Sequence, residues 1–211
     1  MFNILELIIG DFFSIGRNII AHLYNYWPDL AAECERINYS GVIAYHKITG
    51  ERISGPEPVP IGKPTMTLND GSERVIPFNR HHRPKFVAAL LAQVKDLGIE
   101  VTFGAKVTDY FEDIDKQKAG IVFESGQKIE ADIVIAADGI GTKSNKLVNG
   151  GQDDRAYSSG ISIFRTSFPV DLALADPEVR DRWPLLDWNV PCLEIWGGWV
   201  LYILFLIGFS I

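Results

Sequence analysis

Residues 131–145 read ADIVIAADGIGTKSN, and this stretch decides the fold that the sequence predicts. Residues 133–137 form an apolar run without a helical period, and Asp138 and Gly139 follow at once. Such a run is typical of a strand buried on both faces in the parallel sheet of an α/β fold. Ligands of open α/β sheets bind beyond the carboxyl ends of the strands. We therefore expect Asp138 to accept hydrogen bonds from a ligand and Gly139 to let the backbone approach it closely.

The composition is that of a globular protein and limits the classes of partner. The 211 residues are 47% apolar and 22% charged, and the formal net charge is −7. A negative charge argues against nucleic-acid binding, which favours basic surfaces. Cys34 and Cys192 lie far apart in the sequence and form neither a metal-type spacing nor a disulfide framework. We expect a reducing, cytoplasmic compartment, and the beginning of the chain lacks the basic region of a secretory signal.

The end of the chain is an uncharged apolar tail. Residues 195–211 read IWGGWVLYILFLIGFSI, which is slightly short of the roughly 20 residues that span a bilayer. The tail fits three descriptions: buried strand sequence, a marginal membrane anchor, or an abnormal end to a shortened chain. Membrane attachment is therefore possible only through this tail.

Hydrophobic periodicity and turn signals predict alternating helices and strands. Asn18 is a plausible N-cap, and a proline-rich loop is expected over 55–64. The predicted helices cover 18–27, 29–37, 84–97 and, broken at Pro177, 171–183. Predicted hairpins join 42–46 to 51–54 and 66–68 to 74–78. Further strands are expected at 99–103, 106–112, 120–124, 128–130, 132–137 and 158–168.

Residues 139–144 nearly match the dinucleotide-binding pattern G-x-G-x-x-G. Such a turn would place a pyrophosphate at a helix N-terminus, as in a nicotinamide-dependent dehydrogenase. The third glycine is replaced by Ser144, and residues 158–168 lack the acid expected about 20 residues further on. This alternative is therefore the weaker interpretation of Gly139 and Gly141.

A different family matches better. The segment 132–144 resembles the Asp-Gly motif of the flavin-dependent aromatic hydroxylases, single-component monooxygenases of the salicylate-hydroxylase type. Residues 78–86, FNRHHRPKF, are similar to the His-Arg-x-x-Leu segment of that family. Residues 98–107 resemble its next pair of strands, and 159–169 resemble the start of its substrate-domain sheet. The three motifs occur in the family's order.

The resemblance implies an α/β fold with an incomplete FAD-binding domain, Rossmann-like and of the glutathione-reductase type, followed by the start of a substrate-domain β-sheet. The implied domains are residues 1–155 and 156–211. Arg83 matches the arginine that contacts FAD, although a surface cation is the ordinary alternative. Asp138 and Gly139 match the motif that holds FAD, although a strand-end turn could also use them. Arg165 matches an arginine of the substrate domain, where a structural salt bridge is equally plausible.

The resemblance also implies a function. Members of the family use NAD(P)H to reduce FAD, and they hydroxylate a small aromatic substrate with O₂. Asn145 stands where the family usually has arginine. The family's N-terminal glycine fingerprint and its later Gly-Asp motif are not found in this sequence. We therefore expect a fragment of such an enzyme that binds FAD weakly or not at all, with a catalytically inactive remnant as the alternative. The four histidines are expected to be structural or on the surface.

Overall fold

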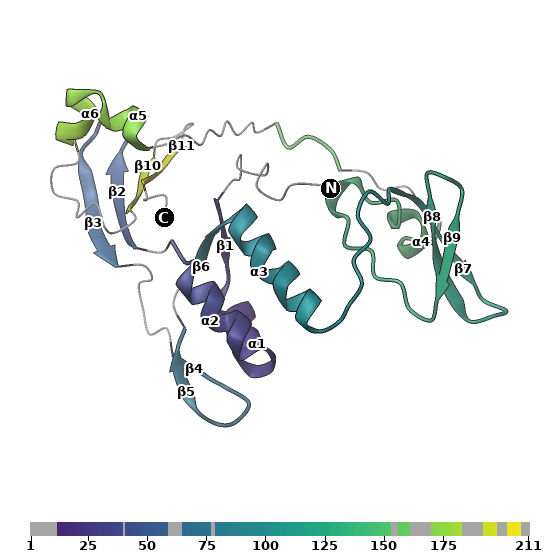
Figure 1. The fold of residues 1–211 in the computed structure, drawn as a ribbon. Helices are drawn as coiled ribbons and strands as arrows, with labels where there is room; N and C mark the ends of the chain where they lie inside the picture. Colours follow the sequence, from purple (N-terminus) through teal and green to yellow (C-terminus); the bar gives the residue numbers. More distant parts are fainter. Residues whose placement is uncertain are drawn as a thin grey trace. The chain divides into compact units, whose positions relative to one another are not determined.

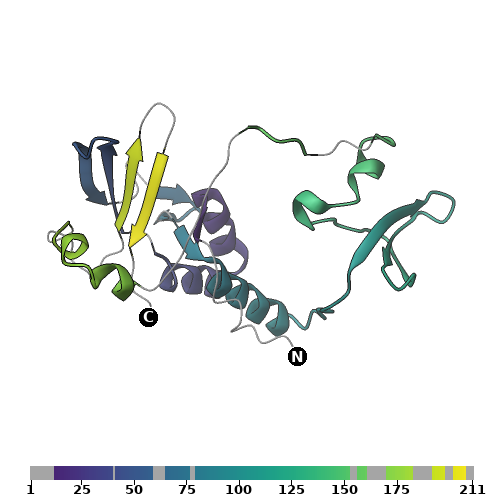
Figure 2. The same ribbon diagram turned by 90° about the horizontal axis from the view of Figure 1, so that it is seen from above.

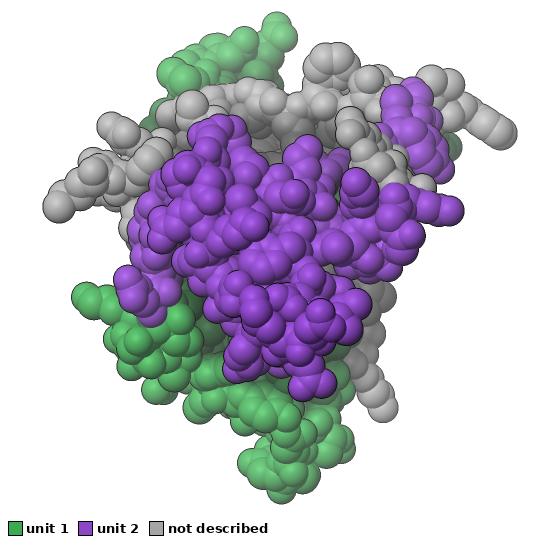
Figure 3. Space-filling view, turned by 90° about the vertical axis from the view of Figure 1, so that its right-hand side faces the viewer, with its two compact units in different colours: residues 1–99, 165–211 green, residues 100–164 purple. Residues whose placement is uncertain are grey.

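The computed structural model describes residues 12–39, 41–58, 65–76, 79–152, 156–160, 170–182, 192–197 and 202–207. The chain divides into two units, one of residues 1–99 and 165–211 and one of residues 100–164 (Figure 3). The domain boundary predicted at residue 155 stays a prediction. Each unit is described by itself.

The first unit combines helices with short strands (Figure 1). Its helices are α1 Arg17–Tyr26, α2 Pro28–Arg36, α3 Arg83–Asp96, α5 Val170–Leu174 and α6 Pro177–Arg182. Its strands are β1 Phe12–Ile15, β2 Val42–Lys47, β3 Arg52–Pro58, β4 Thr65–Thr67, β5 Glu73–Val75, β6 Asn79–His82, β10 Cys192–Gly197 and β11 Tyr202–Ile207. The helix predicted over 171–183 is interrupted near Pro177, as expected. Helix α5 ends at Leu174, and α6 begins at Pro177.

The hydrophobic core of this unit lies between α1, α2 and the β1–β6 pair. Ile20 and Ala31 are completely buried, and Phe86 and Leu90 of α3 pack partly against the same cluster. The expected N-cap Asn18 is wrong: α1 begins after Gly16 without a side-chain cap. Helix α3 is only partly covered, since none of its residues is fully buried.

Strand β6 connects the core to α3. It pairs antiparallel with β1, so that Phe12 lies opposite His82 and Ser14 lies opposite Arg80. The segment 80–83, which the sequence presents as a short basic cluster, is therefore mostly internal: Arg80 is 7% exposed and His81 is completely buried. Helix α3 begins directly after this strand, with Pro84 in its first turn.

A four-stranded sheet joins distant parts of the chain in the order β11-β10-β2-β3. Strand β10 lies parallel to β2 and antiparallel to β11. The neighbouring yellow arrows of Figure 2 are β10 and β11. The predicted hairpins are confirmed as β2–β3 and β4–β5. The loop predicted over 55–64 is wrong as far as Pro58, since β3 continues to that residue. Residues 202–207 of the apolar tail form a strand of this sheet.

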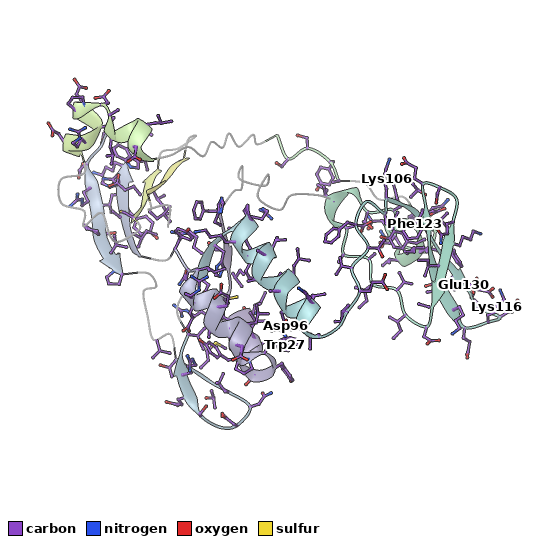
Figure 4. All side chains as sticks on the ribbon, in the orientation of Figure 1. Trp27, Asp96, Lys106, Lys116, Phe123 and Glu130 are labelled. Carbon is purple, nitrogen blue, oxygen red and sulfur yellow. The ribbon has the colours of Figure 1, made fainter. Side chains whose placement is uncertain are left out.

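The second unit contains a three-stranded antiparallel sheet of β7 Val107–Asp113, β8 Lys118–Phe123 and β9 Lys128–Ala131. Its other elements are the 3₁₀ turn η2 Gly139–Gly141 and the short helix α4 Asn145–Val148. Lys116 lies in the turn that joins β7 to β8 (Figure 4). Because Gly120 of the middle strand β8 has no Cβ, the Phe111 ring can pack against its backbone. A Cβ at Gly120 would lie 2.2 Å from Phe111 Cζ.

The segment on which the predicted sheet depended is not a strand. Residues 133–138 have no regular structure, and Ile133 and Ile135 are 78% and 84% exposed. A strand needs at least one hydrogen-bonded neighbour, and no described strand pairs with this segment. The strand predicted over 99–103 is wrong for the same reason. Of the strand predicted over 158–168, residues 158–160 have no regular structure and 161–168 lie outside the described residues.

Candidate functional site

Asp138 is held by hydroxyl groups of the second unit. The Tyr110 hydroxyl, from β7, donates a hydrogen bond of 2.8 Å to Asp138 Oδ2. Hydrogen bonds from Thr142 and then Tyr110 lower the pKa of the Asp138 carboxyl below its usual value, because they stabilise the charged form. Burial and the bond to Asp138 raise the pKa of Tyr110. The arrangement supplies an ionised carboxylate in a fixed orientation.

Gly139 follows the carboxylate in the left-handed region. Its φ is +76°, and a Cβ at Gly139 or at Gly141 would meet no atom within 4 Å. A ligand could therefore approach this backbone without a side chain in the way. The context of a dinucleotide fingerprint is missing here, because no described strand ends directly before Gly139 and α4 has only four residues.

Arg83 is the first residue of α3 and is exposed. Its guanidinium carbon lies 5.1 Å from the centre of the Phe13 ring, which helps to fix the side chain. Nearby Lys85 donates a hydrogen bond of 2.7 Å to the Tyr39 hydroxyl. A helix N-terminus already carries partial positive charge, so both cations lie where the helix dipole does not favour them. Their position suits an anionic ligand better than it suits helix stability.

The strand before this helix end is anchored to the turn after α2. The Arg80 backbone N–H donates to Asn38 Oδ1 at 2.8 Å, and the Tyr39 N–H donates to the Arg80 carbonyl at 2.8 Å. Burial lowers the pKa of His81, which favours the neutral imidazole. His81 is therefore structural, as expected of the histidines. This rigid support fixes where α3, and with it Arg83, begins.

The predicted site residues thus lie in separate parts of the structure. Asp138 and Gly139 are neighbours in the second unit, and Arg83 belongs to the first. Arg165 lies outside the described residues. A ligand shared by Arg83 and Asp138 stays a prediction. Sequence reasoning missed Tyr110, because no motif marks it and its contact with Asp138 spans 28 positions of the chain.

It also missed a buried polar cluster in the four-stranded sheet. His46 of β2 and Glu194 of β10 have side chains that are only 2% and 4% exposed, with Nε2 and Oε1 3.6 Å apart. The indole of Trp196 donates to Glu194 Oε2 at 3.2 Å and stacks on His46 with ring centres 4.8 Å apart. A register between strands that are about 150 positions apart creates this cluster, and no local sequence signal predicts it.

Comparison with known proteins finds relatives of one kind. The chain is 39% identical over 189 residues to the FAD-dependent monooxygenase fsr3 of Gibberella fujikuroi, and the match covers 90% of this chain and 35% of that protein. It is 34% identical over 192 residues to an FAD-dependent monooxygenase of Claviceps purpurea, covering 90% and 36%. The chain is homologous to FAD-dependent monooxygenases over nine tenths of its length. It spans about a third of the length of these curated relatives, and no family model matches it.

Solved structures show the same fold. The structure of CtdE in complex with FAD and substrate 4 has a TM-score of 0.70 at 24% identity, and the match covers 93% of this chain and 44% of that one. The structure of native FqzB has a TM-score of 0.62 at 20% identity, covering 90% and 39%. The expected α/β fold, part of an FAD-binding monooxygenase, is therefore confirmed, although residues 133–137 do not form the strand on which that expectation was based.

No helix in the described part of the chain has the length and apolar character of a membrane span. Among the same residues, no group of three His, Cys, Asp or Glu side chains could hold a metal ion.

Proposed function

We propose that this chain supplies part of the FAD site of an NAD(P)H-using monooxygenase that hydroxylates a small aromatic molecule. The observation that carries the proposal is the Asp138 carboxylate, held by Tyr110 beside the open backbone of Gly139. The family relationship says which cofactor such a site would take. The proposal includes a cytoplasmic location and, for Arg165, a contact with the substrate.

The residues present fit the chemical groups of FAD. Its sugar hydroxyls donate hydrogen bonds, and an ionised carboxylate such as Asp138 is an acceptor. Its pyrophosphate is anionic, and Arg83 with Lys85 places two cations at the beginning of α3. Gly139 and Gly141 leave room for a close approach.

Bound FAD would supply the redox chemistry, taking a hydride from NAD(P)H and activating O₂. The overall reaction converts an aromatic C–H, O₂, NAD(P)H and a proton into the hydroxylated ring, water and NAD(P)⁺. One oxygen atom enters the ring and the other leaves as water. Residues of this chain orient the cofactor through Asp138 and neutralise its charge through Arg83.

One observation favours the alternative of an inactive remnant. Ile133 and Ile135 are almost fully exposed directly before the Asp138 site, so the segment that carries the site has no packed support in the described structure. A chain of this kind would fold in part and bind no cofactor. Flavin binding separates the two proposals.

The test is a titration of the purified chain with FAD, followed by flavin fluorescence. Because only part of a complete site is proposed, saturable binding is expected with a Kd between about 1 μM and 1 mM. Arg83→Ala and Asp138→Asn should each weaken it about 10-fold or more, since each removes a charge-assisted hydrogen bond. Arg36→Ala and Asp115→Asn, which change exposed charges elsewhere, serve as controls. No saturable binding, or equal weakening in the controls, would contradict the proposal.

A further inference from the structure

The Tyr110 hydroxyl holds the Asp138 carboxylate. From β7 it donates a hydrogen bond of 2.8 Å to Asp138 Oδ2. We propose that Tyr110 is a positioning residue that fixes this carboxylate as the acceptor for a sugar hydroxyl of FAD. The inference rests on the proposed function and assigns its supporting residue.

A carboxylate needs such support at an exposed position. Asp138 is exposed, so without a partner its side chain would change between rotamers. A carboxylate offers about four lone-pair positions. Tyr110 occupies one of them, which leaves acceptor capacity for a ligand and restricts its direction. Ordering the group before a ligand arrives removes part of the entropic cost of binding.

A purely structural role makes a different prediction. The Tyr110–Asp138 bond also ties β7 to the turn at Gly139, so its loss could loosen the second unit without any consequence for a ligand. Stability alone therefore cannot decide between the two roles. The titration of the Asp138 carboxyl and the affinity for FAD can.

The experiment compares Tyr110→Phe with the unmodified chain. Tyr157→Phe is the matched control, since Tyr157 is 92% exposed. Tyr110→Phe should raise the Kd for FAD about 2- to 10-fold, the effect of one hydrogen bond. It should also raise the pKa of the Asp138 carboxyl, followed by its ¹³C chemical shift. Tyr157→Phe should change neither property.

The outcomes separate this inference from the proposed function. FAD binding that Tyr110→Phe leaves unchanged would overturn the inference alone. An Asp138 titration that is the same in Tyr110→Phe and in the unmodified chain would also overturn it, because the hydroxyl would then not hold the carboxylate. No FAD binding by the unmodified chain would overturn the proposed function and, with it, the flavin role of Tyr110.

Discussion

The buried pair of His46 and Glu194 predicts a coupled response to two substitutions. Both side chains lie on the same face of the four-stranded sheet, and Nε2 and Oε1 are 3.6 Å apart. His46→Leu removes the ring that lies beside the Glu194 carboxyl group and stacks on Trp196. Glu194→Leu removes the carboxyl group that accepts a hydrogen bond from the Trp196 indole. Each substitution therefore leaves buried polar groups with one partner fewer.

The structure sets the magnitudes. With side chains only 2% and 4% exposed, each single substitution should cost about 1–3 kcal/mol, the range for a buried polar group that loses a partner. The double substitution should cost less than the sum, with a coupling energy of about 0.5–3 kcal/mol.

The assay is equilibrium unfolding in urea, followed by tryptophan fluorescence, because Trp196 stacks on His46. The control is the exposed pair Lys47–Glu51 of the same hairpin, with Nζ and Oε2 2.7 Å apart and side chains 54% and 63% exposed. Lys47→Ala should change the free energy of unfolding by less than about 1 kcal/mol. If the costs of His46→Leu and Glu194→Leu add in the double variant, the pair is not coupled as described.

Three further predictions concern packing and burial. Gly120→Ala should destabilise the second unit by about 1–3 kcal/mol and lower its melting temperature by several degrees, because the added Cβ would lie 2.2 Å from Phe111 Cζ and 2.6 Å from the Ile129 carbonyl oxygen. The calorimetric control is Gly141→Ala, where the added Cβ would meet no atom within 4 Å. Equal melting temperatures of the two variants would contradict the packing. Ile20→Ala should cost about 2–5 kcal/mol in urea unfolding, against less than about 0.5 kcal/mol for the half-exposed Ile19→Ala, and a small effect at Ile20 would mean that it is not in the core. Burial raises the pKa of the Cys34 and Cys192 thiols to about 11 each, so neither should react with a thiol reagent at neutral pH until the chain is unfolded. Unfolded thiols ionise near pH 8.5, so the unfolded state loses protons first and stability should fall as the pH rises from about 9 to about 11; the Cys34→Ala/Cys192→Ala variant should show a shallower fall, and an identical fall would refute the assignment.

Local signals predicted much of the secondary structure. Proline and glycine marked the beginning of α2, the break between α5 and α6 and the turns of both hairpins, because their backbone preferences act within a few residues. The antiparallel strands β7, β8 and β9 were predicted because each pairs with its neighbour in sequence. Such pairing needs no information from the rest of the chain.

The errors occurred where structure depends on distant partners. The apolar run 133–137 has strand composition but no pairing partner among the described strands, so its sequence alone could not make it a strand. The His46–Glu194 cluster and the Tyr110–Asp138 bond arise from strand register and from turn placement, which periodicity does not report. In contrast, the Asp-Gly and His-Arg motifs pointed to flavin-dependent monooxygenases, the kind of protein to which the chain is 34–39% identical over 90% of its length.

The central claim is that Asp138 and Gly139 contact FAD. Hydrogen exchange measured with and without saturating FAD tests it most directly, through a peptide that covers residues 138–145. This peptide should exchange more slowly when FAD is bound, while the β2–β3 turn at 48–51 stays unchanged. Equal exchange of residues 138–145 with and without FAD would contradict the claim.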